Sequence, residues 1–559
     1  MTTNLGLLNF YRALIIVTLF MSVNSNGQNI QSSGTDFWFG YMESLTPSFN
    51  GPPKFSLQLS STASTDVTIE VPGRGYEHTM TLSSNEVVNF DFPGFDLEPR
   101  GSGVITNLAV FISSVESIEV VAIHHRQYFS SSTRLFPVHS LGKEYMVLGA
   151  RDDAQRSPSS LVIVAGLDST FVNICLTPCG SKGSINVTLN KGQTYQLQSL
   201  DDVSGTKITT NKPVSVFSGA RQAVLNKADD SHIYFAMPTL DLADTFYAAV
   251  PNLELNDFSY IVILGTKNNT SVTVNDDEYL LQDGESKHIK IDGPRIIESS
   301  KPIFVGQYNS GSDNWLIRAG PSMTVLNPVC SGLKSVKFIT KEDFSGSMLE
   351  HAYTIITRDT LDVYFDSIKV VGFSKFPAIQ LFYKVAGIEN GPHEISSSTG
   401  FSGHVYGRSE AEYYTFSFGF SADCLSTDYR VHDTAQKDKD WDIFPNLTKP
   451  EKVVYDTVQK GKVQSIKKDT KSFYSINQEE CDKWQISPNP NNGIFGIKIN
   501  GSNVKLDNIE IYDARSRLVY ASEWNDNQFE YLNTDLAAGM YYLRISPCDV
   551  AKKFVVIKE

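Results

Sequence analysis

Hydrophobic and polar residues alternate in a pattern that recurs along most of this chain. A short apolar strand, a polar turn and a second strand follow one another, and the turns are rich in Ser, Thr, Asn and Asp. This order is typical of β-hairpins, because successive residues of a strand face opposite sides of the sheet. The pattern begins at Phe55 (FSLQLSSTASTDVTIEV), at Ser159 (SSLVIVAGLDSTFVNICL) and at Phe258 (FSYIVILGTKNNTSVTVN), and a divergent fourth copy runs from about His351 to Asp423.

Shared phrases follow these strands. A Lys-Pro dipeptide enters an apolar strand at Lys212 and again at Lys301, and a Pro-containing stretch then precedes the next copy. The spacing of roughly eighty to a hundred residues indicates stacked or radially arranged units. Helix signals are poor, and LDLADTFYAAV at residues 240–250 is the best local candidate.

The rest of the chain divides into three parts. Arg12, the apolar run from Ala13 to Val23 and the small polar residues after it predict a signal peptide over residues 1–27, cut near Gln28. Residues 425–483 are polar and charged, which predicts a flexible linker. Strand signals resume at ISPNPNNGIFGIKI, and the short strands from 484 to 559 predict a small immunoglobulin-like β-sandwich.

The predicted fold class is therefore all-β. We expect repeated β-hairpin or sandwich units in the body, with a β-repeat domain over residues 28–338 and a further β-sandwich unit over 339–424. A linker over 425–483 and the C-terminal sandwich over 484–559 complete the chain. The four aromatic residues of the first strand and its end (Phe37, Trp38, Phe39 and Tyr41) fit a core better than a binding platform.

Charge and cysteine content narrow the compartment and the partners. The net charge is −14 with no cluster of Lys and Arg, so we expect no nucleic-acid partner. Six cysteines fit an oxidising compartment. The favoured pairing joins Cys175 with Cys179, Cys481 with Cys548 and Cys330 with Cys424, although the spacing allows other connectivities.

Motifs for catalysis, cofactors and metals are missing from the sequence. The histidine pair His124-His125 precedes Arg126, and its members face opposite sides of a strand, so we interpret it as an exposed strand end. Neighbouring acids such as Asp201-Asp202 and Asp276-Asp277 are typical of solvated turns and do not face each other across a cleft. The sequence therefore predicts no catalytic residue, no cofactor and no metal site.

The last segment resembles the C-terminal sorting domain (type A) of type IX secretion cargo. The resemblance depends on the opening turn, on an Asp after the third strand and on the Leu-x-x-Gly-x-Tyr phrase, whereas the usual Gly after Asp513 is replaced. Its residues are Pro488, Asn489, Pro490, Gly493, Asp513, Leu536, Gly539 and Tyr541. The resemblance implies export by the type IX secretion machinery to the medium or outer surface of a gram-negative bacterium, after a signal peptide has directed the chain to the periplasm.

The body carries a second resemblance. GTDFWFG at Gly34, together with the repeated phrases, is similar to the N-terminal domain of the IgGFc-binding protein family, over about Gly34 to Phe338 or as far as Asp423. Antibody binding does not transfer with the domain, since one fold hosts many functions.

These observations favour a secreted or surface-bound, non-enzymatic binding or adhesion protein with an extracellular protein or glycan as partner. Two alternatives stay open: a secreted hydrolase acting on extracellular polymers, and a structural component of a cell-surface layer. A dispersed catalytic site would favour the hydrolase, and self-association without a soluble ligand would favour the structural component.

Overall fold

The structure is a computed structural model of the chain. It describes residues 31–44, 52–126, 129–150, 156–179, 183–225, 230–252, 259–309, 320–329, 332–340, 350–377, 379–409, 413–421, 484–487, 494–499, 508–513, 518–523, 529–533, 536, 539–546 and 548–556. The predicted signal peptide and the whole of the predicted linker lie outside these ranges. The chain divides into two compact units, Met1–Asp428 (the body) and Tyr429–Glu559 (the C-terminal unit).

The body is built from β-strands, as predicted, and they form four repeats of one topology. Repeat 1 holds β1 (Gly34–Phe39), β2 (Lys54–Ser61), β3 (Thr65–Val71), the 3₁₀ turn η1 (Pro72–Arg74), β4 (Tyr76–Leu82), β5 (Val87–Asp91), β7 (Val110–Arg126) and β8 (Phe129–Arg134). The short strand β6 (Val104–Thr106), which precedes β7, joins the sheet of repeat 2. Repeat 2 holds η2 (Val138–Ser140), β9 (Gly142–Met146), β10 (Ser159–Ala165), β11 (Thr170–Cys175), β12 (Ser184–Leu189), β13 (Thr194–Ser199), β14 (Lys207–Ala223) and β15 (Ser231–Ala236).

The other two repeats follow the same order. Repeat 3 holds η3 (Leu240–Leu242), β16 (Asp244–Ala249), β17 (Ser259–Gly265), β18 (Thr270–Val274), β19 (Asp277–Leu281), β20 (Ser286–Ile291), β21 (Arg295–Asn309) and β22 (Ser322–Val325). Repeat 4 holds β23 (Leu333–Ile339), β24 (Glu350–Thr357), β25 (Val363–Phe365), β26 (Ile368–Lys369), β27 (Ser374–Lys375), β28 (Phe382–Ile388), β29 (Pro392–Arg408) and β30 (Tyr413–Ser417). The predicted boundary at residue 338 falls inside β23.

Each repeat is organised around one long strand, which is β7, β14, β21 or β29. The first half of β7 pairs with β1 and β3, and its second half pairs with β2 and β8. The other long strands pair in the same way, so each repeat is one sheet whose long strand pairs with different strands along its two halves. The predicted hairpin between β2 and β3 is wrong, because β7 lies between them, and the hairpin of the repeat is β3–β4. A polar turn that passes over an intervening strand gives the same residue pattern as a hairpin turn.

The expected helix at residues 240–250 is also wrong. Only the single turn η3 is helical, and β16 takes the residues after it. Tyr247 is buried in this strand, where its hydroxyl donates to the carbonyl of Ile303 on β21 at 2.8 Å. Strand pairing and this tertiary contact therefore override the local helical pattern.

The Lys-Pro phrases lie where the long strands change partners. Pairing of β14 with β9 skips from Thr209 to Val214. Pro213 lies in this gap, where the backbone does not pair with β9. Because proline has no backbone N–H, no hydrogen-bond donor is left without a partner at this residue. Lys212 Nζ donates to the carbonyl of Asp168 at 2.6 Å, and Lys301 Nζ donates to that of Asn268 at 2.5 Å. The Lys-Pro phrase thus marks a bend and holds a nearby loop in both repeats.

In repeat 2, the buried Tyr145 on β9 forms hydrogen bonds at the same bend. The Tyr145 hydroxyl accepts from the backbone N–H of Gly142 at 2.9 Å and donates to the carbonyl of Val214 at 2.6 Å. We expect Tyr145→Phe to lower the free energy of unfolding by about 1–3 kcal/mol, because the buried carbonyl of Val214 and the partly buried N–H of Gly142 lose this hydrogen-bond partner. Urea unfolding followed by fluorescence measures this change.

The matched control is Tyr364→Phe on β25. Tyr364 is half-buried, and its hydroxyl has no partner within the described part of the chain. If both variants unfold at the wild-type urea concentration, the hydroxyl of Tyr145 does not hold the bend.

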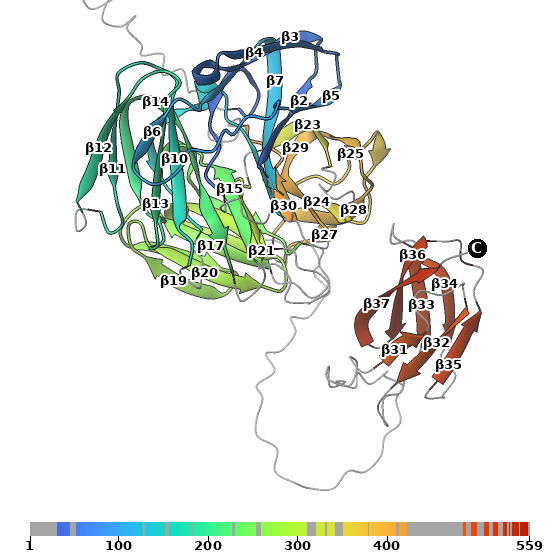
Figure 1. Ribbon diagram of the computed structural model, residues 1–559. Helices are drawn as coiled ribbons and strands as arrows, with labels where there is room; N and C mark the ends of the chain where they lie inside the picture. The colour runs from blue at the N-terminus through green and yellow to red at the C-terminus, as the bar shows by residue number, and fades with distance from the viewer. Residues whose placement is uncertain are drawn as a thin grey trace, which may run out of the picture. The chain divides into compact units, whose positions relative to one another are not determined.

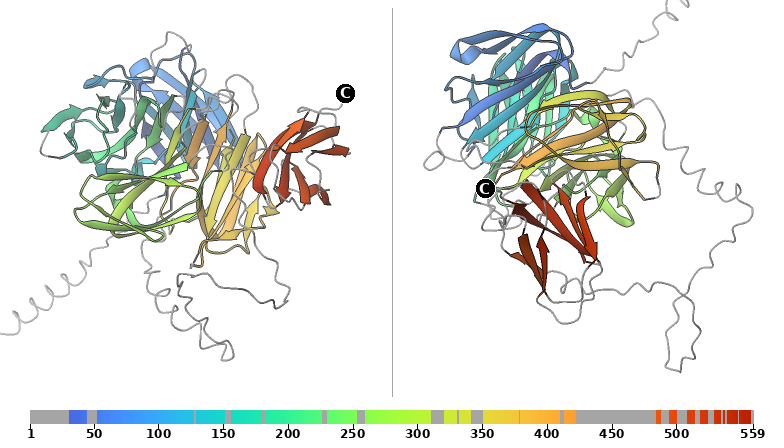
Figure 2. Two further views of the ribbon diagram at one scale, coloured as in Figure 1. Left: turned by 90° about the horizontal axis from the view of Figure 1, so that it is seen from below. Right: turned by 90° about the vertical axis from the view of Figure 1, so that its right-hand side faces the viewer.

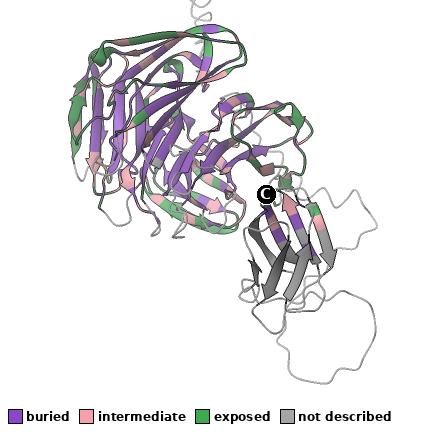
Figure 3. Cartoon of the chain, turned by 45° about the vertical axis from the view of Figure 1, so that its right-hand side comes forward, coloured by how far each residue is buried: buried purple, intermediate pink, exposed green. Residues whose placement is uncertain are grey.

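The four repeats close into a ring. Their last strands contact one another in cyclic order, β8 with β15, β15 with β22, β22 with β30 and β30 with β8. Figure 1 and Figure 2 show the repeats following one another around this centre, from blue to orange. Figure 3 shows that buried residues run along the inner strands and that exposed residues lie mainly at the outer edges. The units are therefore radially arranged.

Apolar clusters fill the joints between neighbouring repeats. The predicted core residues Phe37, Trp38, Phe39 and Tyr41 are buried at the joint of repeats 1 and 2, together with Phe217 of β14. Other clusters join repeat 2 to repeat 3, repeat 3 to repeat 4, and repeat 4 to repeat 1. The prediction that the first aromatic strand belongs to a core is confirmed.

The C-terminal unit contains two antiparallel sheets, as the predicted sandwich requires. One sheet has the order β31-β32-β35 and the other β34-β33-β36-β37. The strands are β31 (Trp484–Ser487), β32 (Ile494–Ile499), β33 (Asn508–Asp513), β34 (Leu518–Glu523), β35 (Phe529–Asn533), β36 (Gly539–Ser546) and β37 (Cys548–Val556). Ile509 and Ile511 of β33 and Leu543 of the neighbouring strand β36 are buried. Within the described residues, no helix has the length and apolar character of a membrane span.

Candidate functional site

The His124-His125-Arg126 stretch ends the long strand β7, and its predicted exposure is wrong. The side chains of His124 and Arg126 are 1% and 0% exposed. They point to the same side of the strand, two residues apart, and both reach the carboxylate of Glu98. Sequence reasoning missed Glu98, because it lies in a loop with no motif around it.

Ser44, Glu98, His124 and Arg126 form a buried network, which we call the Glu98 cluster, and the partly exposed Arg100 also pairs with Glu98. Arg126 Nη2 lies 3.1 Å from Glu98 Oε2, and Arg126 Nε donates to Ser44 Oγ at 2.7 Å. His124 Nε2 lies 2.8 Å from Glu98 Oε1, and the hydroxyl of Ser44 donates to that same oxygen. The cluster thus ties the end of the β1 segment, the loop before β6 and the end of β7 together.

The electrostatics of this cluster favour a permanent charge on Glu98. Burial would raise the pKa of the Glu98 carboxyl, but the hydrogen bond and charge of His124, and then Arg126 and Ser44, outweigh burial and hold this pKa well below its ordinary range. Every member of the cluster is less than a tenth exposed. The burial of these groups and their contacts with one another indicate that the cluster stabilises the fold.

Further buried histidines lie near the ring centre. Ser131 Oγ is 3.0 Å from His232 Nδ1, and the His232 ring contacts the ring of His124 with centroids 4.6 Å apart. Burial, and next the neighbouring His124, lower the pKa of His232 well below its ordinary value. On β29, His404 Nε2 donates to Asn252 Oδ1 at 2.9 Å, and burial lowers its pKa to about 4.

These histidines make the ring sensitive to acid. His404 stays neutral in the folded chain until about pH 4, whereas an unfolded histidine takes up its proton near pH 6.5. The contribution of His404 to folding is complete above pH 6.5 and is lost as the pH falls toward 4, by about 3 kcal/mol at most. We expect His404→Gln to flatten the loss of unfolding free energy between pH 6.5 and 4, measured by denaturant titration at each pH. An unchanged pH slope in the variant would contradict this assignment.

A polar groove lies where the last repeat meets the first. Its volume is about 290 Å³, close to the lower end of the roughly 300–1,000 Å³ range of small-molecule sites. One wall comes from β2, its following turn and β7 of repeat 1, and the other from β23 of repeat 4. Its lining residues are Gln31, Ser32, Ser33, Ser60, Ser61, Thr62, Ser117, Glu119, Gly332, Leu333, Lys334, Ser335, Val336, Lys337, Phe420 and Ser421.

The two ends of the body meet along this groove. Gln31 bridges to Ser421, and the Ser32 N–H donates to the carbonyl of Phe420 at 2.9 Å. On the other side, the amide of Gln58 donates to the carbonyl of Ile339 at 2.7 Å and accepts from its N–H at 3.3 Å. The ring is therefore closed by backbone and amide hydrogen bonds around an open groove.

The charges at the groove are unevenly matched. Glu119 lies 3.1 Å from Arg134, and burial raises its pKa although Arg134 opposes this. Lys337 lies 2.6 Å from Glu394. Lys334 is exposed and has no partner within the described part of the chain. The groove thus has one uncompensated positive charge.

A second opening lies at one end of the ring centre. Its volume is about 30 Å³, and residues of all four repeats line it, including Arg134, Phe235, Tyr247 and Ser417. This volume holds about one or two water molecules. It is too small for an organic ligand.

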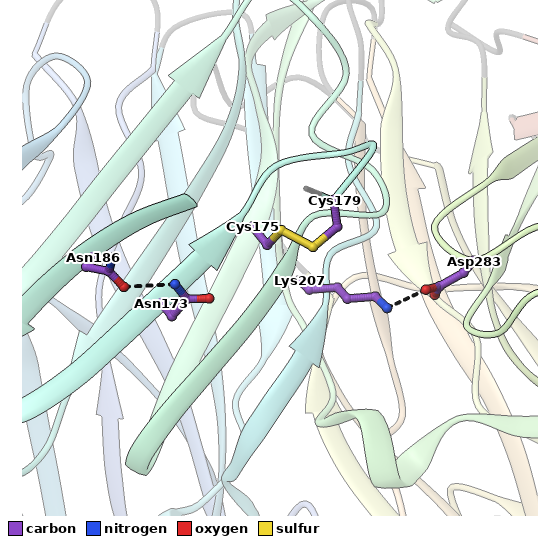
Figure 4. The surroundings of a disulfide bond; sticks show 6 residues. All are labelled: Asn173, Cys175, Cys179, Asn186, Lys207 and Asp283. Carbon is purple, nitrogen blue, oxygen red and sulfur yellow. Dashed lines mark hydrogen bonds and ion pairs between the residues drawn. A yellow bond between two sulfur atoms is a disulfide. The ribbon is translucent and has the colours of Figure 1, made fainter. Parts of the chain in front are cut away.

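The predicted disulfide between Cys175 and Cys179 is confirmed. It closes the end of β11, with Cα atoms 5.2 Å apart. Figure 4 shows it beside the ion pair of Lys207 with Asp283, which joins repeats 2 and 3. Cys330, Cys424 and Cys481 lie outside the described residues, so their pairing and that of Cys548 stay predictions.

The sorting-motif residues are only partly described. Asp513 and Tyr541 lie opposite each other on β33 and β36, and Leu536 and Tyr541 are buried. Gly539 begins β36. The turn residues Pro488, Asn489, Pro490 and Gly493 lie outside the described residues. Among those described, no group of three or more His, Cys, Asp or Glu side chains is placed to hold a metal ion.

Comparison with known proteins identifies two segments. The family model described as IgGFc binding protein matches residues 131–407, from β8 almost to the end of β29. The model described as Secretion system C-terminal sorting domain matches residues 485–558. Both resemblances are confirmed, although the first match begins after the GTDFWFG phrase and extends past residue 338. The sorting domain makes this chain a secreted or outer-surface protein of a gram-negative bacterium.

Individual relatives are more distant. The IgGFc-binding protein of Homo sapiens is 34% identical over 124 residues, which span 20% of this chain and 2% of that protein. Among solved structures, the BSP domain of a biofilm associated protein aligns at 9% identity with a TM-score of 0.13, covering 75% of this chain and 82% of that one. A Salmonella alpha-2-macroglobulin reacted with methylamine aligns at 7% identity with a TM-score of 0.13, over 94% of this chain and 40% of that one. TM-scores this low do not indicate a shared fold.

Proposed function

We propose that this chain is a non-enzymatic protein that is exported by the type IX secretion machinery and binds an extracellular protein or glycan. The polar groove between repeats 1 and 4 carries the proposal. It is large enough for a small polar group, and its wall is built from strands held by the ring on both sides. Sites positioned on rigid strands bind without a large ordering cost.

The lining of the groove supports binding over catalysis. Its lining residues include no His and no Cys, and its one carboxylate, Glu119, is held by Arg134. A hydrolase needs a nucleophile with a base, or two carboxylates that face each other across the bond to be cleaved. The described groove residues supply neither pair.

The test is a binding screen with the chain purified from the culture medium. We expect it to bind at least one member of an array of extracellular glycans and host-surface proteins. Thr62→Trp places a large side chain at the exposed rim of the groove and is expected to remove that binding, while Thr79→Trp on the exposed face of β4 leaves it unchanged. Binding to no array member, or self-association alone, would contradict the proposal and favour a surface-layer component.

A further inference from the structure

The groove hydroxyls are available to a ligand. Ser33, Ser60, Thr62 and Ser117 line it, and within the described part of the chain their hydroxyls have no hydrogen-bond partner. A hydroxyl offers one donor and two acceptor positions. The wall therefore presents several unused donors and acceptors around one groove, which suits a ligand that itself carries many hydroxyl groups.

The strand edge beside these hydroxyls is already occupied. Among the described strands, β23 pairs with β29 alone and is therefore an edge of its sheet. Gln58 takes both backbone groups of Ile339, and the N–H of Lys337 donates to Glu119. The pairing shifts register between Leu333 and Ser335. Such caps and bulges protect an edge strand, so a peptide that adds as a further strand finds few free backbone groups.

The apolar residues of the groove offer no exposed ring. The one aromatic residue among the described lining residues, Phe420, is 4% exposed. Leu333 and Val336 also line the groove, and their side chains are buried. Among the described residues, the groove therefore has no exposed aromatic side chain on which a flat ligand could stack.

The charged side chains of the groove favour one kind of hydroxylated ligand over others. Glu119 and Lys337 each have an ion-pair partner, in Arg134 and Glu394. Lys334 on β23 is exposed without one within the described residues. An ammonium group attracts an anion and forms stronger hydrogen bonds to a carboxylate than to a neutral hydroxyl. The groove is matched to a ligand with one negative charge.

We propose that the groove between repeats 1 and 4 binds a carboxylated sugar residue, with its carboxylate at Lys334 and its hydroxyls on the free hydroxyls of Ser33, Ser60, Thr62 and Ser117. This inference rests on the proposed binding function and names the chemistry of its ligand. The sugar acid is either free in solution or the end of an extracellular glycan chain, and both present the same groups.

The test compares glucuronic acid with glucose, which lacks the carboxylate. Isothermal titration of the intact secreted chain is expected to give glucuronic acid at least about tenfold tighter binding, since a charge-assisted hydrogen bond contributes about 1.5–3 kcal/mol. Lys334→Ala is expected to bring glucuronic acid to the affinity of glucose. Lys369→Ala, which removes an exposed lysine from β26 of the same repeat, is expected to change neither.

Glucuronate-terminated oligosaccharides separate the two sources. Tighter binding of the oligosaccharide than of the free sugar assigns the site to glycan ends, and equal binding assigns it to the single residue. Equal affinity for glucose and glucuronic acid, or no binding of either, overturns the inference. If the array screen then still detects a protein ligand, the proposed function survives and only the sugar-acid site is lost.

Discussion

Deleting residues 485–558 is expected to remove the chain from the culture medium and the outer surface and to leave it in the periplasm. The segment matches a secretion sorting domain, and its two described sheets form a compact unit that the body does not need for its own core. The expected effect is large, because a sorting domain acts as an address that is either present or absent. Immunoblots of medium, surface and periplasmic fractions measure it.

A rescue experiment tests whether the truncated chain has a general export defect. Attaching the sorting domain of another cargo of the same secretion system to residue 484 is expected to restore the chain to the medium. Release of the truncated chain at the wild-type level would show that residues 485–558 are not the export signal.

Replacing Glu98 by alanine is expected to destabilise the body by about 3–5 kcal/mol, because the fully buried Arg126 then loses the carboxylate that balances its charge. That loss is a large part of the roughly 5–15 kcal/mol that holds an ordinary domain folded. Guanidinium unfolding of the secreted chain, followed by intrinsic fluorescence, gives the difference.

Glu77→Gln is the matched control. Glu77 is exposed on β4 of the same repeat, and its replacement is expected to change the unfolding free energy by less than about 0.5 kcal/mol. Equal unfolding midpoints for Glu98→Ala and Glu77→Gln would show that the cluster does not stabilise the ring.

Local sequence patterns predicted the strands, because alternation and turn residues are properties of neighbouring positions. The sequence phrases that recur between repeats also reflect local interactions. Asn190 N–H donates to the Gln193 side chain, and Gln282 N–H donates to that of Glu285, so the turns KGQ and DGE repeat one hydrogen bond. The short loop from Cys175 to Cys179 was likewise predictable, since few residues separate the two sulfurs.

The pairing of strands and the site were not predictable in the same way. β2 and β3 are neighbours in sequence, but β7 enters the sheet between them from a distant part of the chain. Glu98 meets Arg126 only after β7 is placed. The groove is lined by residues 31–33 and by residues 332–337. Neither segment has a local sequence pattern that indicates contact with the other. Such contacts depend on ring closure, which local patterns do not encode.

The central claim is that the exported body binds its ligand without altering it. Incubating the secreted chain with the tightest ligand from the array, and weighing the recovered ligand by mass spectrometry, tests this most directly. The account predicts a stable complex and a ligand of unchanged mass after prolonged incubation. A shortened ligand would contradict the account. If the Thr62→Trp variant loses both this cleavage and the binding, the chain is a hydrolase that acts at the groove.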